Sequence, residues 1–239
     1  MGSLGEASFS APTEVVSADG LLFDFDGTII DSTEAIVKHW HSLGKEMGVD
    51  PEVILQTSHG RRSIDVLRLY DETKANWDYI NRMEGLIPRE YGKDAVEIPG
   101  ARDLLDQLDS LSVPWAVVTS GTRALVTGWI DVLKLSPPRT LVVAEDVENG
   151  KPDPACYLLG QRRLGMSDKA NMIVFEDAPS GIRAGKAAGF KVIGLATTHT
   201  LDQIREAGAD WIVQDLRSIK VKDFDGGIIK LAVHNAVID

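Results

Sequence analysis

The stretch LLFDFDGTII, residues 21–30, decides the fold, because an apolar run ends there in two closely spaced carboxylates. Residues 21–25 have the composition of a buried strand, and continuous apolar strands are typical of parallel sheets covered on both faces. Asp24 and Asp26 lie two positions apart, so a strand points both side chains to the same side. We therefore expect a buried strand that delivers two acidic groups to the edge of a sheet.

Further β-rich runs recur along the chain and alternate with helix-like segments. The runs are residues 115–119, 140–144, 172–175, 191–196 and 211–213, and the helix-like segments lie near 122–134, 154–164, 180–188 and 201–207. Alternating strands and helices indicate an α/β fold, and we predict a Rossmann-like, doubly wound parallel sheet. Ligands bind such sheets beyond the carboxyl ends of the strands.

The first two predicted strands depart from this alternation of one strand and one helix, because about 90 residues separate Phe25 from Trp115. Residues 33–96 contain no β-rich run but show helical periodicity, which places Ile36 and Trp40 on one helical face, where we expect core packing. We predict an inserted helical domain over 33–96, a discontinuous α/β core over 18–32 and 97–239, and a flexible N-terminal tail over 1–17.

Composition excludes several classes of protein. The net charge of −11 argues against a general nucleic-acid-binding surface, and no apolar run reaches bilayer-spanning length. A single cysteine excludes an intramolecular disulfide, and the first residues lack the basic and apolar regions of a secretory signal. We expect a cytoplasmic protein, monomeric and without a nucleic-acid or membrane partner.

Polar and charged residues follow several of the predicted strands at their carboxyl ends. These residues are Asp24, Asp26, Thr119, Ser120, Gly121, Lys151, Glu176 and Asp177. Four carboxylates in one small volume repel each other, so the cluster predicts a compensating cation, and Mg²⁺ prefers such oxygen ligands. A cation, an ammonium group and hydroxyl donors together suit a phosphoryl group. One aspartate could attack phosphorus while the other moves protons.

Each signal alone has a plainer interpretation. An Asp-Gly pair after a strand is often only a turn, and Lys151 in GKPDP could be a solvated lysine. A hydroxyl residue after a strand is often a helix N-cap, a role that Thr122 also fits, and Glu176-Asp177 could merely begin a loop. These residues form four polar segments along the chain: Asp24 to Asp26, Thr119 to Gly121, Lys151 with its loop, and Glu176-Asp177. Each segment follows an apolar strand or its loop, and this order favours the catalytic interpretation.

The four segments resemble the motifs of the haloacid dehalogenase superfamily. FDFDGTIID resembles the first motif, VVTSG the second, GKPDP the third and VFEDAPSGIRAGKAAG the fourth, in that order. The resemblance implies that Asp24 is the nucleophile and becomes an aspartyl phosphate. It implies that Asp26 protonates the leaving oxygen and then activates water, that Thr119 and Ser120-Gly121 hold the phosphoryl group, and that Lys151 neutralises it.

The same resemblance implies a magnesium site and a type of reaction. Asp24, Asp177 and the main-chain carbonyl of Asp26 would bind Mg²⁺, with Glu176 as a further contributor. Dehalogenases of this superfamily lack an aspartate at the position of Asp26, so its presence favours phosphoryl transfer. The helical domain would be a cap that closes over the site.

Two segments of the predicted cap resemble a narrower group. TSHGRRSIDVL and NRMEGLIPREYGKDAVEIPGA are similar to the fungal glycerol-3-phosphatases and their 2-deoxyglucose-6-phosphatase relatives. The resemblance places His59-Gly60, Arg61 and Arg62 on a loop that selects the substrate, and adds Glu84 without assigning its role. Solvated surface arginines and a packed, hydrogen-bonded histidine are the alternatives.

We therefore predict a Mg²⁺-dependent phosphatase of a small polyol or sugar phosphate. The resemblance favours glycerol-3-phosphate, glycerol-1-phosphate or 2-deoxyglucose-6-phosphate as substrate, hydrolysed through an aspartyl phosphate. A sugar phosphomutase of the same superfamily is the first alternative, and a non-catalytic sugar-phosphate binder is the second.

Overall fold

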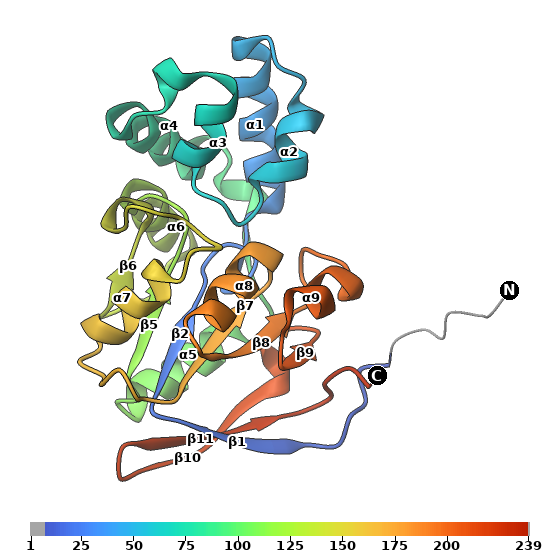
Figure 1. The fold of residues 1–239 in the computed structure, drawn as a ribbon, viewed down its shortest axis with the longest axis vertical. Helices are drawn as coiled ribbons and strands as arrows, with labels where there is room; N and C mark the ends of the chain where they lie inside the picture. The colour runs from blue at the N-terminus through green and yellow to red at the C-terminus, as the bar shows by residue number, and fades with distance from the viewer. Residues whose placement is uncertain (1–7, 239) are drawn as a thin grey trace, which may run out of the picture.

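Six strands form a wholly parallel sheet in the order β6-β5-β2-β7-β8-β9 (Figure 1). The chain is described here from a computed structural model, over residues 8–238. The strands are β2 (Gly20–Phe23), β5 (Trp115–Val118), β6 (Leu141–Val142), β7 (Met172–Glu176), β8 (Lys191–Leu195) and β9 (Trp211–Val213). All six predicted strands are present, and the strand order reverses at the central β2. The predicted doubly wound α/β fold is confirmed, and ligands bind such sheets beside this reversal.

The sheet is buried on both faces, as its continuous apolar strands require. Leu21 and Phe23 belong to one hydrophobic cluster and Leu22 to another, because successive side chains of a strand point to opposite faces. Helices α5 (Ala101–Ser110) and α6 (Arg123–Leu133) pack on the first face, and α7 (Ala155–Arg163), α8 (Pro179–Ala187) and α9 (Leu201–Ala207) pack on the second.

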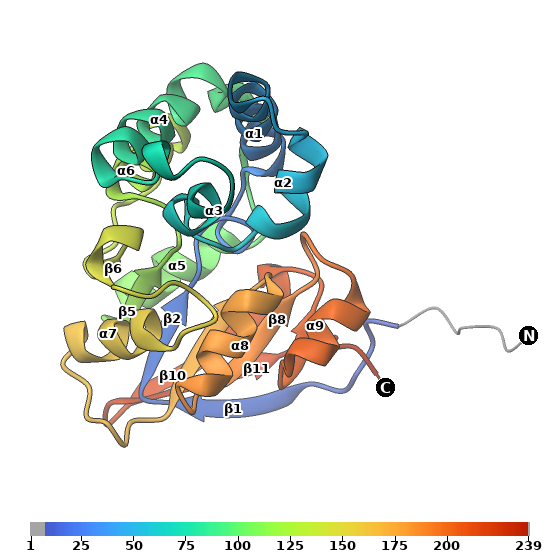
Figure 2. The same cartoon turned by 45° about the horizontal axis from the view of Figure 1, so that its top comes forward.

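A separate helical layer lies over the carboxyl ends of the strands (Figures 1 and 2). It contains α1 (Thr33–Met47), α2 (Pro51–Ser58), α3 (Ser63–Tyr70) and α4 (Trp77–Glu90), with the short 3₁₀ turns η1 (Glu72–Lys74) and η2 (Gly92–Asp94). Most of its buried apolar side chains, among them Trp40 and Ile54, form their own hydrophobic cluster, whereas Ala35 and Ile87 belong to the cluster on the first face of the sheet. We call this helical part of residues 33–96 the cap, while its status as an independent domain stays a prediction.

The two chain segments that join the cap to the core lie side by side. The strands β3 (Ile30–Asp31) and β4 (Val96–Glu97) pair in antiparallel register, with Ile30 opposite Glu97. The cap therefore leaves and re-enters the core at one point, close to the end of β2, and sits directly over that edge of the sheet.

A second sheet, which the sequence analysis missed, corrects the predicted tail. The strands β1 (Glu14–Ala18), β11 (Ile228–Val233) and β10 (Ile219–Asp225) form an antiparallel sheet in the order β1-β11-β10. Residues 14–17 are thus part of a strand and not a flexible tail, because Val16 and Ala18 are buried in the hydrophobic core. Residues 1–7 of the predicted tail lie outside the described residues.

Within the described part of the chain, every helix falls short of the length or the apolar character that a bilayer-crossing segment needs.

Two neighbouring valines test the role of β1. Val16 is 5% exposed, whereas Val15, on the opposite face of the strand, is 56% exposed. We expect Val16→Asp to lower the free energy of unfolding by about 3 kcal/mol or more, because it buries an unpaired charge. The matched variant Val15→Asp should change it by less than about 1 kcal/mol. Urea unfolding of both variants measures the difference, and two equally small effects would show that residues 14–18 behave as a tail.

Candidate active site

The turn after β2 holds its two aspartates at the edge of the sheet. The main-chain N–H of Asp24 donates to the carbonyl of Phe175 (2.9 Å), and the carbonyl of Phe25 accepts the N–H groups of residues 29 and 30. Gly27 closes the turn with φ +88°, and a Cβ atom there would lie 2.2 Å from Oδ2 of Asp177. Only glycine fits both the positive φ and the close approach.

A buried lysine joins the first strand to the fourth motif. Lys151 Nζ donates to Oδ1 of Asp24 (2.6 Å) and to Oε1 of Glu176 (2.8 Å), and to the carbonyl oxygen of Val118 (3.2 Å). Burial alone would lower the pKa of Lys151, but the charges of Asp24 and Glu176 outweigh it and raise this pKa well above its usual range. The ammonium group therefore keeps its charge.

Glu176 is held in place by donors from the protein. Besides Lys151, its carboxylate accepts from the hydroxyl of Tyr157 (3.1 Å) and from the main-chain N–H of Ala178 (2.8 Å). Burial raises the pKa of Glu176, although Lys151 opposes the shift. The hydroxyl of Tyr157 is a contact that the sequence analysis did not anticipate.

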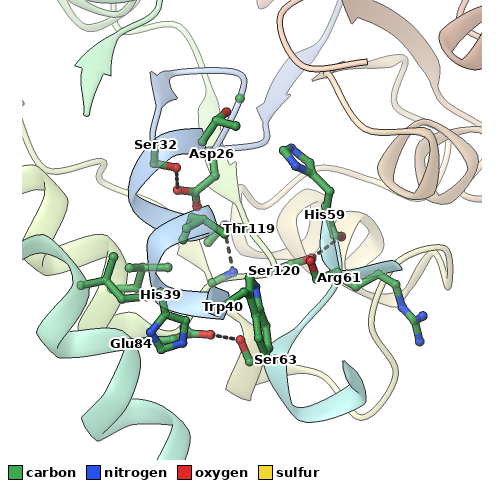
Figure 3. Close-up of a pocket in the computed structure, with 18 of the residues that line it drawn as sticks. Asp26, Ser32, His39, Trp40, His59, Arg61, Ser63, Glu84, Thr119 and Ser120 are labelled. Carbon is green, nitrogen blue, oxygen red and sulfur yellow. Dashed lines mark hydrogen bonds between the residues drawn. The ribbon is translucent and has the colours of Figure 1, made fainter. Parts of the chain in front are cut away.

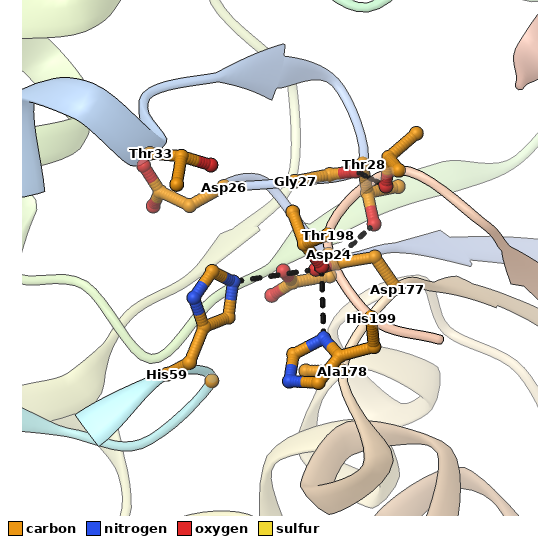
Figure 4. A network of polar contacts seen from close by, with 12 residues as sticks. Asp24, Asp26, Gly27, Thr28, Thr33, His59, Asp177, Ala178, Thr198 and His199 are labelled. Atoms are coloured by element: carbon orange, nitrogen blue, oxygen red, sulfur yellow. Dashed lines mark hydrogen bonds and ion pairs between the residues drawn. The ribbon is translucent and has the colours of Figure 1, made fainter. Parts of the chain in front are cut away.

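Asp177 lies at the centre of a second polar network (Figure 4). Its Oδ1 accepts from the hydroxyl of Thr28 (3.1 Å), its Oδ2 accepts from the hydroxyl of Thr198, and Nε2 of His59 lies 3.5 Å from the same Oδ2. Burial alone would raise the pKa of Asp177, but the hydrogen bond and charge of His59 lead a set of opposing effects that leave it below its usual value. Asp177 is therefore ionised.

Three of the predicted metal ligands come together. One ligand oxygen each from Asp24, Glu176 and Asp177 lies within 4.8 Å of the other two, and all three residues are buried. Lys151 brings one positive charge against three carboxylates, so the donor set fits a divalent cation that is bound by oxygen. The side chain of Asp26 is outside this cluster, and the predicted contact through its main-chain carbonyl stays a prediction.

Asp26 instead faces the cavity between the core and the cap (Figure 3). Its Oδ1 accepts from the hydroxyl of Ser32 at 2.6 Å. Burial raises the pKa of Asp26 to about 6, even though the hydrogen bond from Ser32 acts in the opposite direction. A carboxyl group with this pKa can both donate and accept a proton near neutral pH.

The second motif lies beside this aspartate. Thr119, Ser120 and Gly121 line the same cavity, and Oγ1 of Thr119 accepts from the N–H of Gly121 (3.0 Å). The side chain of Thr122 caps α6 by accepting from the N–H of Leu125 (3.2 Å), so the plainer N-cap interpretation is confirmed for this residue.

The cap loop is docked on the core through a glycine carbonyl. The main-chain oxygen of Gly60 accepts from the hydroxyls of Ser120 (3.0 Å) and Ser180 (3.2 Å). Gly60 has φ +71°, and a Cβ atom there would lie 2.6 Å from Cβ of Ala178. His59, Gly60 and Arg61 line the cavity as predicted for the loop, while the side chain of Arg61 points away from Asp26 (Figure 3).

The structure contradicts both interpretations of Arg62, as a residue that selects the substrate and as a solvated surface arginine. Its side chain is only 3% exposed and does not line the cavity. It forms a two-point ion pair with Asp65 (2.7 and 2.9 Å) and donates to the carbonyls of Val147 (2.7 Å) and Glu148 (3.0 Å). Arg62 is therefore neither a solvated surface residue nor a group available to substrate. It clamps the cap to the loop that leads to Lys151.

Glu84 is a second contact between the cap and the core. Its Oε1 accepts from the hydroxyl of Ser63 (2.5 Å) within the cap, and its Oε2 accepts from the main-chain N–H of Thr122 (2.8 Å) in the core. Burial raises the pKa of Glu84 to about 7, against the effect of these hydrogen bonds. The residue also lines the cavity, so its position can affect substrate and cap closure together.

Cap side chains that the sequence analysis did not single out as site residues complete the wall of the cavity. The polar ones are His39, Ser58 and Ser63, and the apolar ones are Ile36, Trp40 and Ile87. Burial lowers the pKa of His39 to about 4, so this imidazole is neutral at physiological pH. The helical periodicity of Ile36 and Trp40 indicated core packing, and both residues also line the cavity. An apolar pattern in the sequence does not distinguish a cavity wall from a hydrophobic core.

Comparison with known proteins gives a consistent assignment. The family model described as "Haloacid dehalogenase-like hydrolase" matches residues 21–195. Glycerol-1-phosphate phosphohydrolase 1 of Saccharomyces cerevisiae is 43% identical over 212 residues, covering 85% of both chains. 2-Deoxyglucose-6-phosphate phosphatase 1 of the same yeast is 37% identical, covering 89% of this chain and 94% of the relative. A hydrolase structure from Pseudomonas syringae has a TM-score of 0.72 at 23% identity, covering 82% of this chain and 94% of that one.

The stability of the protein should depend on the charge of Glu84. Its pKa is about 7 in the folded protein, against an ordinary value of 4.5. Between these two values the folded state binds more protons than the unfolded state. The free energy of unfolding therefore falls as pH rises through this window. The side chain of Glu84→Gln cannot ionise, so this fall does not occur in the variant. The free energy of unfolding of Glu84→Gln minus that of wild type should therefore increase from pH 5 to pH 8. Urea unfolding with chelator present measures the trend.

A matched control for this prediction is Glu90→Gln, on the exposed end of the same helix. Its stability should follow that of the wild type at every pH. Equal pH dependence in Glu84→Gln and wild type would contradict a raised pKa at Glu84.

Proposed function

The chain belongs to the haloacid dehalogenase-like hydrolase family, and on that premise we propose that it is a Mg²⁺-dependent phosphatase of small polyol and sugar phosphates. The observation that carries the proposal is the pairing of Asp24 with a second, separately held aspartate. Asp24 belongs to the carboxylate cluster and contacts Lys151, while Asp26 faces the cavity with a pKa of about 6.

The first chemical step uses both aspartates. An oxygen of the Asp24 carboxylate attacks phosphorus, the bond between phosphorus and the ester oxygen breaks, and the group becomes an aspartyl phosphate. Asp26, in its protonated form, gives its proton to the departing oxygen, so the product leaves as an alcohol. Lys151 lies 2.6 Å from Asp24, where its charge can stabilise the phosphoryl group.

The second step regenerates the enzyme. Asp26, now ionised, takes a proton from a water molecule, whose oxygen attacks phosphorus and releases inorganic phosphate and the Asp24 carboxylate. Mg²⁺, held by Asp24 and Asp177, would supply the positive charge that brings the phosphate to the carboxylate cluster. Thr119 and the main chain of Ser120-Gly121 line the cavity beside Asp24 and would hold the phosphoryl oxygens.

The cavity supports a small hydroxylated substrate. Its cap wall combines polar groups, such as Ser63 and Glu84, with the apolar side chains of Trp40 and Ile87. Buried polar groups bind hydroxyl groups, and apolar walls pack against a carbon chain. Together with the similarity to the yeast phosphatases, this wall favours glycerol-1-phosphate, glycerol-3-phosphate and 2-deoxyglucose-6-phosphate as substrates. The exact substrate, the monomeric state and the cytoplasmic location stay predictions.

Two alternative functions use the same residues differently. A phosphomutase would return the phosphoryl group to another hydroxyl of the sugar, and a non-catalytic binder would hold the sugar phosphate unchanged. The complete set of Asp24, Asp26, Lys151 and Asp177 in one site argues against loss of catalysis. Analysis of the products separates all three functions.

A phosphate-release panel tests the proposal. We expect inorganic phosphate from glycerol phosphates or deoxyhexose phosphates in the presence of Mg²⁺, and little release with chelator. Asp24→Asn should abolish turnover, because it removes the nucleophile. An isomerised sugar phosphate instead of free phosphate would identify a mutase. Tight binding of sugar phosphates without any turnover would identify a binder and overturn the proposal.

The role of Asp26 predicts a difference between leaving groups. Asp26→Ala should lower kcat for an alkyl phosphate by about 10²–10⁴-fold, because the alkoxide then leaves without a proton. p-Nitrophenyl phosphate needs no proton to leave, so the variant should release one burst of nitrophenolate per enzyme and then turn over slowly. Rapid-mixing absorbance measures the burst, and Asp24→Asn should show none.

The pH profile of the wild-type enzyme provides a control for this role. Asp26 has a pKa of about 6, so the protonated acid becomes scarce as pH rises, and activity on alkyl phosphates should be highest near or below neutrality. A rate that still climbs above pH 9 would contradict the assignment of Asp26 as the acid.

A further inference from the structure

A second cluster of metal-binding side chains shares Asp177 with the carboxylate cluster. His59, Asp177 and His199 each offer one ligand atom, and these three atoms lie within 4.8 Å of one another. The two imidazole rings are edge to face, with centroids 4.8 Å apart, and both lie beside Asp177 (Figure 4). Neither histidine belongs to the steps assigned to Asp24 and Asp26.

The three ligands come from three different parts of the fold. His59 lies on the cap loop after α2, Asp177 directly follows β7, and His199 lies on the loop between β8 and α9. In this arrangement the hydroxyl of Thr198 donates to Oδ2 of Asp177 and lies 2.9 Å from Nδ1 of His199. His199 is thus already linked to the carboxylate through one hydroxyl group, and His59 contacts the same oxygen directly.

The distances suit a tetrahedral transition metal. Zinc binds imidazole nitrogen and carboxylate oxygen at about 2.0–2.2 Å, so two of its tetrahedral ligands lie roughly 3.3–3.5 Å apart. His59 Nε2 and Asp177 Oδ2 are 3.5 Å apart, which matches such an edge. The ligand atom of His199 lies within 4.8 Å of the other two, and His199 is on an irregular loop, where a small rotation of the ring is inexpensive.

The chemistry of the ligands separates this cluster from the one that suits Mg²⁺. Two imidazoles and a carboxylate suit zinc and similar ions once His59 has lost the proton that pairs it with Asp177, whereas Mg²⁺ requires oxygen ligands in octahedral geometry. Asp24, Glu176 and Asp177 offer only oxygen. Because Asp177 is common to both clusters, a metal bound to the histidines competes with Mg²⁺ for this carboxylate.

We propose that His59, Asp177 and His199 form an inhibitory binding site for Zn²⁺ or a similar transition-metal ion. The bound ion joins the cap loop to two core loops, so it both withdraws Asp177 and holds the cap against the core. Binding itself does not depend on the substrate, whereas its inhibitory effect rests on the proposed phosphatase function. The site is completed by water in the remaining position, as three protein ligands allow.

The first experiment measures metal binding without substrate. The wild-type protein, freed of metal, is titrated with Co²⁺ as a spectroscopic substitute and with Zn²⁺ in competition with a coloured chelator. We expect one Co²⁺ per chain with the strong visible absorption of a four-coordinate site, which six oxygen ligands do not give. His199→Ala and His59→Ala should each lower the Zn²⁺ affinity at least about tenfold, because a ligand is lost.

Matched variants keep this test falsifiable. His41→Ala removes an exposed histidine of α1 that pairs with Glu52, and its Zn²⁺ affinity should equal that of wild type. His199→Gln, with circular dichroism and thermal unfolding, shows whether a loss reflects misfolding. Unchanged Zn²⁺ affinity in both His59 and His199 variants, together with its loss in Asp24→Asn, would place zinc among the carboxylates and overturn the proposal.

The second experiment measures the competition between the metals. In the wild-type protein, Zn²⁺ should raise the Mg²⁺ concentration that half-saturates phosphate release, and His199→Ala should weaken this effect at least about tenfold. Zinc binding that leaves the Mg²⁺ requirement unchanged would overturn the inhibitory role. Failure of the phosphatase proposal is seen separately, because an inactive protein could still give the Co²⁺ spectrum.

Discussion

The site depends on the balance between one buried ammonium group and three buried carboxylates. Lys151 contacts Asp24 and Glu176 directly, and the ligand oxygens of Asp24, Glu176 and Asp177 lie within 4.8 Å of one another. Burying like charges is costly unless other charges compensate for them. The deficit of positive charge explains why this edge of the sheet suits a metal ion and a phosphoryl group, and why the structure around it is rich in donors.

Contact between the cap and the core is polar as well as apolar, and three of the polar contacts reach core segments of the active site. Gly60 binds Ser120 of the second motif, Glu84 binds the N–H of Thr122, and Arg62 binds carbonyls of the loop before Lys151. Opening of the cap would break all three contacts, while closing it fixes these segments. The cap therefore shapes the cavity and positions core residues in the same movement.

Local sequence patterns predicted the parallel sheet because its strands are apolar on both faces and leave a continuous signal. The strand β1 was missed because only Val16 and Ala18 of its five residues are buried, so its residues are placed by the pairing with β11 and not by their own composition. Arg62 was misplaced for a similar reason, since the carbonyls of Val147 and Glu148 that bury it are more than eighty residues away. Thr198 and His199 follow β8 as other site residues follow their strands, so the same rule could have found them.

The sequence by itself determined the order of the strands along the chain, the acidic and basic residues at their carboxyl ends, and the family resemblance that assigns Asp24 and Asp26 separate roles. These features are local, because each depends on a short run of residues and on the period of a strand. Only the tertiary structure decided that His59 and His199 meet at Asp177, that Glu84 reaches α6, and that Arg62 is a clamp. Such contacts depend on how the cap packs over the sheet, and that packing brings together residues whose separation along the chain carries no signal of proximity.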